Sequence, residues 1–394
     1  MDKIEQPLRI LIVLNLPWDV RFGATRVWME LAEQWRTRGH TVEKFSLNEA
    51  FPRGAASRIA SVFRQPLFAF RAAAFVRKNR DRFDVIDALI GALPFSKRRL
   101  NFQGLLVARS VGLPQLYDQF ERSVARRWPH LPRGRLGGRI LRAFVRREGL
   151  RMASRSIAQA DLLNLPNEEE ATYLRREIGS TQPLIVQPYG LTTAQGAALL
   201  QAASAPAVRL GKKKICFIGM WGARKGSHDW SEIIRRVRER VPDAEFRFLG
   251  TMVNAEAMRR DLGGLASTGV EFIPEYQPDE LPALLADCAV GAFPSYVEGF
   301  GFAVIEQLAA GIPTVAYDVA GPRHILGGQF AELLVPAGDL VAFAAALVGV
   351  LQLGEEAYQL LSTRSVQTAG RFSWPVIADE TLVSYQGALA QTRR

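Results

Sequence analysis

The chain has 394 residues, enough for two domains of ordinary size, each with its own hydrophobic core. It is 48% hydrophobic and contains no biased tract, which excludes a fibrous or intrinsically disordered protein. The formal net charge of +11 is unevenly placed: residues 1–206 carry +14 (32 Lys and Arg against 18 Asp and Glu), and residues 207–374 carry −3 (16 against 19). A positive field of this kind attracts nucleic acid, anionic lipid or acidic substrates and does not select among them.

The cysteines and the apolar runs bear on where the protein resides. Cys216 and Cys288 lie far apart in the sequence, and neither belongs to a C-x-x-C pair. We therefore expect two reduced core thiols in a cytoplasmic protein. The N-terminus lacks the basic and then apolar pattern of a signal peptide. The longest apolar run, residues 341–351, is too short to span a bilayer and is interpreted as a buried helix.

The first half begins with a β-α-β pattern. Residues 9–16 form a nearly continuous apolar run, typical of a central parallel strand. An amphipathic helix is expected over 26–38, ended by Gly39, and a second strand begins at Thr41. The G-x-G-x-x-G fingerprint of dinucleotide-binding proteins is missing from this opening. Later in this half we expect strands at 83–90, 113–117, 162–165 and 184–187, and a helix at 105–111.

A strongly basic segment follows, with fifteen basic residues between Lys97 and Arg155 against three acidic ones. Large apolar residues such as Phe120, Trp128 and Phe144 are interleaved with its arginines. One interpretation is an amphipathic surface that lies on an anionic membrane. An equally favoured one is a core helix with a solvated basic face. Nucleic acid is disfavoured as a partner, because no recognition motif accompanies the charge.

The second half repeats the alternation of strands and helices. Residues 191–210 are rich in Ala and poor in large side chains, which indicates a linker. Beyond it we expect strands at 214–219, 245–250, 270–273, 289–293 and 314–317, and helices at 229–240, 279–286, 302–310 and from about 374 to 390.

The stretch from Phe293 to Arg323 has the pattern of a phosphate site. A glycine-bracketed loop, residues 298–301, precedes the helix at 302–310, whose N-terminus would offer free backbone N–H groups to an anion. Glu298 and Glu306 flank it, and a spacing of eight would place them roughly 80° apart on one helix, so we expect loop and helix groups that converge on one ligand. Carboxylates beside a phosphate are best explained as acceptors for ligand hydroxyls. Phosphate together with a polyol indicates a sugar nucleotide.

These residues resemble a known signature. The E-x7-E spacing, the Gly-Phe-Gly loop and the trailing residues 309–313 (AAGIP) are similar to the donor-binding motif of retaining glycosyltransferases of family 4. The resemblance runs from Arg9 to the last helix and is strongest over 214–323. It implies an α/β protein of the GT-B fold, with two Rossmann-like domains that face each other across a cleft. The implied divisions are an acceptor-side domain over 1–190, a linker over 191–210, a donor domain over 211–374, and a helix over 375–394 that returns to the first domain.

The resemblance also implies roles for the donor-binding residues. Glu306 would hold the ribose hydroxyls and Glu298 a hydroxyl of the sugar. After the strand that ends at Gly219, the family usually has an arginine and, five residues later, a lysine on the diphosphate; Lys225 matches the lysine, but Met220 stands at the arginine position. Arg224 could supply the missing charge from the adjacent position. Backbone amides of four loop residues would complete the phosphate site: Gly299, Phe300, Gly301 and Phe302.

Two departures from the family pattern lie in the first half. In the family the first loop usually carries two glycines near the donor diphosphate. The matching residues here are Gly23 and Ala24, and the Cβ of Ala24 limits how closely the loop can approach the phosphates. Family members also often place a histidine on the acceptor side, after the strand expected at 113–117. This chain has Tyr117 and Asp118 there, and Asp118 is a weak candidate for touching the reacting centre.

We therefore expect a retaining hexosyltransferase that uses a nucleotide-diphosphate sugar and a hydroxyl acceptor, in the assembly of bacterial surface polysaccharide or glycolipid. No D-x-D occurs, so neither a metal site nor a cofactor is expected, and Lys225, Arg224 and the loop amides would meet the diphosphate charge. Expected partners are the donor, a glycan or lipid-linked acceptor and an anionic membrane surface, with no nucleic acid. The expected location is the cytoplasm, peripheral to the inner face of the membrane. Two alternatives stay open: a degenerate sugar-nucleotide-binding subunit and a GT-B epimerase.

Overall fold

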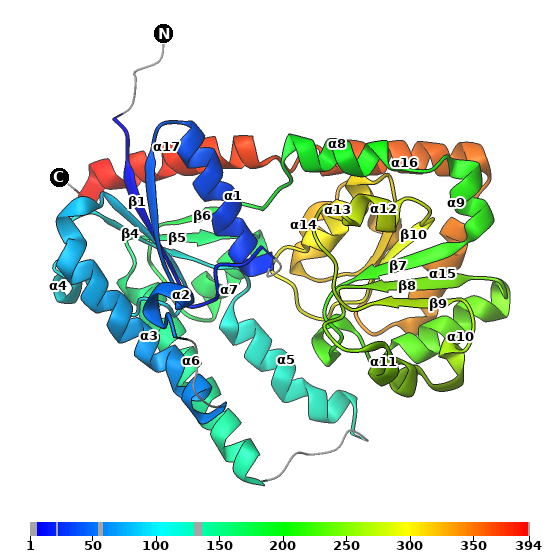
Figure 1. Cartoon of the computed structure of the whole chain (residues 1–394), viewed down its shortest axis with the longest axis horizontal. Coiled ribbons are helices and arrows are strands. Elements are labelled where there is room, and N and C mark those ends of the chain that lie inside the picture. The colour runs from blue at the N-terminus through cyan, green and yellow to red at the C-terminus, as the bar shows by residue number, and fades with distance from the viewer. Residues whose placement is uncertain (1–5, 21–22, 54–57, 130–135, 393–394) are drawn as a thin grey trace. The chain divides into compact units, whose positions relative to one another are not determined.

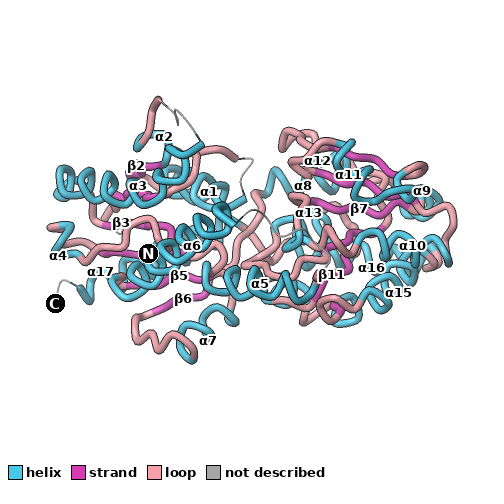
Figure 2. Tube along the Cα trace, turned by 90° about the horizontal axis from the view of Figure 1, so that it is seen from below, coloured by secondary structure: helices cyan, strands magenta, loops and turns pink. Residues whose placement is uncertain are grey.

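The computed structural model describes residues 6–20, 23–53, 58–129 and 136–392. The chain divides into two compact units (Figure 1). Unit 1 consists of Met1–Pro188 together with Trp374–Arg394, and unit 2 of Tyr189–Ser373. Each unit contains one six-stranded parallel sheet, and Figure 2 shows the strands of each enclosed by helices.

The sheet of unit 1 has the strand order β2-β1-β3-β4-β5-β6. Its central strands are buried on both faces, which is why they appear in the sequence as unbroken apolar runs. The strands are β1 (Arg9–Leu14), β2 (Thr41–Ser46), β3 (Val85–Leu89), β4 (Leu105–Arg109), β5 (Leu162–Leu165) and β6 (Leu184–Val186). The helices are α1 (Gly23–Thr37), α2 (Leu47–Ala50), α3 (Arg58–Asn79), α4 (Lys97–Leu100), α5 (Pro114–Arg127), α6 (Leu136–Gln159), α7 (Glu168–Arg176) and α17 (Trp374–Thr392).

The secondary structure expected for 105–117 is wrong. Residues Leu105–Arg109 form β4, which pairs with β3 and β5 and is buried at all five positions. A helix then starts at Pro114, because a proline at the first helical position lacks only an N–H that the helix does not use. A short apolar run has no periodicity to separate strand from helix, so the central position of this one in the sheet decides its conformation. Tyr117 and Asp118 consequently lie in α5 and not after a strand.

The last helix, α17, belongs to unit 1, and the family resemblance implies this return to the first domain. A buried polar network fixes the helix there. Arg109 forms an ion pair with Asp87 at 3.0 Å, and both side chains are fully buried. The Tyr385 hydroxyl of α17 donates to Asp87 at 2.6 Å and accepts from Arg109 at 2.8 Å. Burial raises the pKa of Tyr385, so the phenol keeps its proton. Because breaking a buried charged network leaves an uncompensated group, this network ties the C-terminus to the first sheet.

The sheet of unit 2 has the order β12-β11-β10-β7-β8-β9. Its strands are β7 (Lys214–Ile218), β8 (Glu245–Leu249), β9 (Val270–Ile273), β10 (Val290–Phe293), β11 (Thr314–Tyr317) and β12 (Leu334–Val335). Its helices are α8 (Thr193–Gln201), α9 (Pro206–Lys212), α10 (Trp230–Arg240), α11 (Ala255–Leu262), α12 (Leu281–Leu285), α13 (Phe302–Ala309), α14 (Ala320–Leu326), α15 (Leu340–Leu351) and α16 (Glu355–Ala369).

The segment 191–210, interpreted above as a linker, contains α8 and α9 and belongs to unit 2. Thr192 begins α8 with a capping box, and Pro206 occupies the first turn of α9. Arg209 is buried, and its guanidinium donates to the carbonyls of Ala286 and Ala310 at 3.1 and 2.8 Å. These carbonyls lie at the C-terminal ends of α12 and α13, where a cation is stabilised by the helix dipoles.

No single helix in the described ranges is long and apolar enough to cross a bilayer. Helices α15 and α16 meet that criterion only when taken together, and the chain bends by 112° between them.

Candidate active site

The candidate site of unit 2 is at the carboxyl ends of β7 and β10. In the strand order β10 and β7 are neighbours, and the connection after β7 leads to β8 on one side while the connection after β10 leads to β11 on the other. In open parallel sheets ligands bind beyond the carboxyl ends of the strands at such a switch point. The two loops that emerge there, residues 219–229 and 294–301, contain the cations and the glutamate that the sequence singles out.

The loop after β10 is shaped by close backbone contacts. Gly301 has φ +104° and directly precedes α13, so the helix begins where the glycine-bracketed loop ends, as predicted. Gly321 supports the loop from α14: its N–H donates to the Glu298 carbonyl at 3.1 Å. A Cβ at Gly321 would lie 2.1 Å from the Phe300 carbonyl oxygen, so only glycine fits.

The side chain of Phe300 is part of the packed interior. It is 2% exposed, and its ring contacts those of Tyr189, Phe302 and Phe372 at centroid distances of 5.3, 5.7 and 5.6 Å. Any contact that Phe300 makes with a donor is therefore left to its backbone. Gly299 is buried as well, and the backbone N–H groups at the start of α13 point out of the N-terminal end of that helix.

The loop after β7 packs directly on the loop after β10. Arg224 and Lys225 lie in a single 3₁₀ turn, Ala223–Lys225, which Gly226 ends with φ +76°. A Cβ at Gly226 would be 2.4 Å from the carbonyl oxygen of Pro294, so this glycine permits the close approach of the two loops. The Tyr296 N–H donates to the Arg224 carbonyl at 2.9 Å.

The structure brings Arg224, Lys225 and Glu298 together, although 73 residues separate Lys225 from Glu298. The Lys225 ammonium donates to Glu298 Oε2, and Arg224 Nη1 lies 3.7 Å from the same oxygen. Burial alone would raise the pKa of Glu298, but the charges of Lys225 and Arg224 hold it below its usual value. Burial also lowers the pKa of Lys225, and the Glu298 carboxylate opposes that change. The result is a compact cluster of two cations around one carboxylate.

This cluster is only partly covered. The side chains of Lys225 and Glu298 are 14% and 13% exposed, and that of Arg224 is 27% exposed. The Lys225 ammonium also lies 4.6 Å from the centre of the Phe293 ring, at the end of β10. A group that approaches from solvent can therefore reach all three side chains while the strand ends shield their inner side.

A buried aspartate behind the cluster was not predicted from the sequence. Asp229 is 3% exposed, and its Oδ2 accepts hydrogen bonds from the hydroxyls of Tyr296 and Tyr317, both at 2.7 Å. Burial and the Asp229 charge raise the pKa of Tyr317, so this phenol stays a donor. Asp229 immediately precedes α10, and Tyr296 lies two residues before Glu298. Asp229 thus fixes the start of α10 to the loop that carries the glutamate.

The remaining donor-side residues lie near these loops. Glu306 is in the second turn of α13 and is 7% exposed. Its assignment to the ribose remains a prediction. Gly219 follows β7 with φ +153° and lies against the Lys225 side chain. Met220, which stands where the family usually has arginine, is 51% exposed, so its side chain is not needed for the core.

The candidates in the first half belong to unit 1. Gly23 and Ala24 form the first turn of α1. Asp118 is 7% exposed and pairs with Arg122 of α5 at 2.7 Å and with Arg146 of α6 at 3.0 Å. Its carboxylate therefore holds the two basic helices together, which is a structural role. Because β4 ends at Arg109, the residue that follows the strand is Ser110, whose hydroxyl donates to the buried Glu170 at 2.5 Å.

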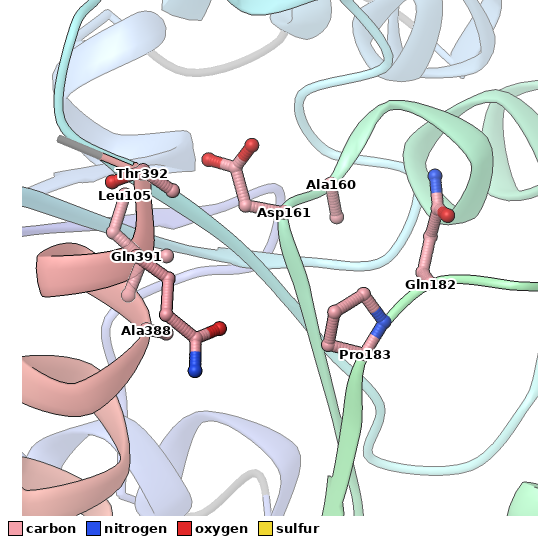
Figure 3. A pocket seen from close by; sticks show the side chains of 8 residues that line it. All are labelled: Leu105, Ala160, Asp161, Gln182, Pro183, Ala388, Gln391 and Thr392. Atoms are coloured by element: carbon pink, nitrogen blue, oxygen red, sulfur yellow. The ribbon is translucent and has the colours of Figure 1, made fainter. Parts of the chain in front are cut away.

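A pocket of about 350 Å³ in unit 1 does not coincide with this site (Figure 3). It lies at the amino ends of β4, β5 and β6, next to Gln391 and Thr392 of α17. Its charged residue, Asp161, already pairs with Lys97 at 3.0 Å and accepts the Leu106 N–H at 2.9 Å. Ligands of open parallel sheets bind at the opposite, carboxyl edge, so we assign no ligand to this pocket.

The cysteines form no disulfide: Cys216 and Cys288 are free and buried. Burial raises the pKa of Cys216, which makes it an inert core thiol. Over the ranges that the structure describes, no three His, Cys, Asp or Glu side chains are arranged to hold a metal ion.

Comparison with known proteins relates this architecture to sugar transfer. Residues 212–353 match the family described as Glycosyl transferases group 1. The phosphatidyl-myo-inositol mannosyltransferase of Mycobacterium leprae is 30% identical over 182 residues, 45% of this chain and 47% of that relative. This chain spans about half the length of the curated relatives that it matches.

The likeness to solved structures extends over nearly the whole chain. Sucrose-phosphate synthase from Thermosynechococcus elongatus has a TM-score of 0.76 at 18% identity, covering 97% of this chain and 100% of that one. The Anabaena protein HepE, solved with UDP and glucose, has a TM-score of 0.66 at 15% identity, covering 96% and 100%. With its two parallel six-stranded sheets, the chain has the GT-B fold.

Proposed function

Because residues 212–353 match the glycosyl transferases group 1 family, we propose that this protein is a retaining glycosyltransferase. It moves a hexosyl group from a nucleotide-diphosphate sugar to a hydroxyl acceptor. The observation that carries the proposal is the cluster of Arg224, Lys225 and Glu298 at the switch point of the second sheet, beside the N-terminus of α13. A diphosphate and a sugar hydroxyl are the ligand groups that such a cluster and helix end would bind together.

The residues of unit 2 would act on the donor as follows. Lys225, Arg224 and the backbone amides at 299–302 stabilise the charge that develops on the diphosphate as the bond from the anomeric carbon to the phosphate oxygen breaks. Glu298 exchanges part of its contact with Lys225 for a sugar hydroxyl, and Glu306 accepts from the ribose. The acceptor oxygen bonds to the anomeric carbon on the face that the phosphate leaves. The acceptor's proton passes to a phosphate oxygen, so no protein base is required.

A sugar-nucleotide-binding subunit without catalysis is the second candidate, and Met220 favours it. An exposed methionine in place of the usual arginine removes one cation from the diphosphate site. Arg224 can compensate for the missing arginine. Its guanidinium lies 3.7 Å from the Glu298 carboxylate and can therefore reach a phosphate bound next to that carboxylate. The epimerase alternative is weaker, because it needs carboxylates in the first domain and Asp118 is already paired with two arginines.

A binding screen tests the donor. We expect one of the UDP-, GDP- or ADP-sugars to raise the melting temperature, since a ligand at a hundred times its Kd stabilises a protein by about 2.7 kcal/mol. The matching nucleoside diphosphate should stabilise as well, and the free sugar should not. Absence of stabilisation by all three nucleotide classes would contradict the proposal.

Activity is expected to be independent of divalent metal. The chain contains no D-x-D sequence, and Lys225 and Arg224 can supply the positive charge that a cation would otherwise provide. Turnover should therefore persist in EDTA at the level seen in untreated enzyme. Complete loss with the chelator and recovery with Mn²⁺ would overturn this part of the proposal.

For the acceptor we propose a glycan or a lipid-linked intermediate of a bacterial surface polysaccharide or glycolipid. The name of the Mycobacterium leprae relative contains phosphatidyl-myo-inositol, and the positive charge of this chain is concentrated in residues 1–206. We place the protein in the cytoplasm, at the inner face of the membrane, where such lipids and nucleotide sugars meet.

A further inference from the structure

We propose that an exposed apolar stripe on α6, together with the arginines beside it, is a docking surface for an anionic lipid bilayer. The stripe consists of Leu141, Phe144 and Val145, which are 45%, 55% and 37% exposed. The inference rests on the proposed function in one respect: the docking surface would bring unit 1 to a lipid-linked acceptor.

The stripe is one face of the helix. Residues at positions i, i+3 and i+4 lie above one another in an α-helix, which is the spacing of 141, 144 and 145. Its neighbours along the helix are exposed as well, since every position from 143 to 147 is exposed. Figure 1 shows the first turns of α6, together with α5, extending beyond the sheet of unit 1.

This stripe is not a continuation of the face that α6 buries. The C-terminal half of α6 contributes Ala153 and Ile157 to a core cluster with Ala108 and Leu163, residues of the central strands. At 100° per residue, the centre of the buried positions 153, 156 and 157 lies roughly 120° around the helix from the centre of the stripe. The apolar residues at 141, 144 and 145 therefore need another explanation than packing against the sheet.

In and directly after the neighbouring helix α5, large apolar residues among arginines are buried. Phe120 and Trp128 are 6% and 7% exposed and pack edge to face at 6.2 Å. Of the two interpretations that the sequence leaves open, core helix and membrane face, the first fits Phe120 of α5 and Trp128, which directly follows that helix. The second fits the exposed stripe of α6.

Charge selects an anionic bilayer as the occupant. Among the residues that the structure describes on α5 and α6, the seven exposed arginines outnumber the three acidic residues, which are the buried Asp118, the exposed Glu121 and the partly exposed Glu148. Arg147 and Arg151 lie next to Phe144 around the helix, and Arg151 is 57% exposed. An apolar strip flanked by arginines is the composition of helices that lie in the interface of a charged membrane. The arginines exposed on these two helices are Arg122, Arg126, Arg127, Arg146, Arg147, Arg151 and Arg155.

Asp118 fixes the basic faces of α5 and α6 relative to each other. Its carboxylate pairs with Arg122 on α5 and Arg146 on α6, so the basic faces of the two helices are linked at one point. Helix α3, which also contacts α6, exposes Leu67 and Phe70 at 50% and 63% and enlarges the apolar area of this unit.

Vesicle co-sedimentation of the full chain tests the proposal without donor or acceptor. We expect binding to phosphatidylglycerol–phosphatidylcholine vesicles and not to pure phosphatidylcholine, with loss as salt shortens the Debye length from about 10 Å at 0.1 M to about 3 Å at 1 M. Phe144→Ser should weaken binding about tenfold, because a phenyl ring no longer enters the interface. Arg147→Ser should weaken it about fivefold.

Matched controls are available in unit 2. Leu360 is 69% exposed on α16 and Arg240 is exposed at the end of α10, so Leu360→Ser and Arg240→Ser remove the same groups elsewhere. Both should bind as wild type does, and all four variants should keep the wild-type melting temperature. Failure of the wild type to bind anionic vesicles at low salt, or equal losses in controls and α6 variants, would overturn the proposal.

Self-association is the other outcome that would overturn it. In that case sedimentation without lipid would show a dimer that Phe144→Ser dissociates, and vesicles would not be bound. Because no nucleotide enters these measurements, a negative result leaves the donor proposal standing, and a failed donor screen leaves the membrane result standing.

Discussion

Lys225→Ala is expected to lower turnover by about 10²- to 10³-fold, the usual loss when one group that stabilises developing charge is removed from an active site. Lys225 lies at the carboxyl end of the second sheet, 14% exposed, and contacts Glu298. Arg224 cannot replace it fully, because its guanidinium is farther from the carboxylate and also donates to the Val297 carbonyl. Initial-rate measurement with saturating donor gives the turnover number.

Lys212→Ala is the control for this variant. Lys212 is an exposed residue at the end of α9 in the same unit and outside the two site loops. It should keep wild-type turnover. If Lys225→Ala and Lys212→Ala were equally active, Lys225 would have no part in the reaction.

The two glutamates are expected to separate turnover from nucleotide binding. Glu298→Ala should lower turnover about 10²-fold while preserving or tightening the binding of the nucleoside diphosphate, because Lys225 and Arg224 lose the carboxylate that competes with phosphate. Glu306→Ala should weaken nucleotide binding roughly tenfold or more, the cost of losing hydrogen bonds to a charged acceptor. Calorimetric titration with the nucleoside diphosphate, beside initial rates, measures both quantities.

Glu256→Ala is the matched control, since Glu256 is an exposed carboxylate in the first turn of α11. Equal losses of nucleotide affinity in the Glu298 and Glu306 variants would contradict the division of roles between loop and helix.

Most of the second unit was predictable because its determinants are local. The loop 298–301, the helix after it and the short strand at Thr314–Tyr317 were expected from glycine positions and apolar runs, and the structure confirms them. The proximity of Lys225 and Glu298 follows from topology, since loops at the carboxyl ends of adjacent parallel strands meet.

Contacts between residues that lie far apart in the sequence and belong to no recognisable motif could not be predicted. Asp229 lies 67 and 88 residues from Tyr296 and Tyr317, and each of these residues alone has an ordinary helix-start or strand-end role. The error at 105–117 has a different cause: the short apolar run at residues 105–108 fits a strand as well as a helix. For the segment that forms α6 the sequence left open whether its apolar residues belong to the core or to the surface, and only the fold shows that Phe144 is exposed.

The measurement that tests the central claim most directly is release of nucleoside diphosphate from the donor that the binding screen selects. It is made in EDTA, with and without glycan and lipid acceptors, for wild type and Lys225→Ala. The account predicts acceptor-dependent release by the wild type, with an α-linked donor giving an α-linked product by NMR, and a loss of about 10²-fold or more in the variant. Tight donor binding by the wild type without release for any acceptor would contradict catalysis and favour the binding subunit.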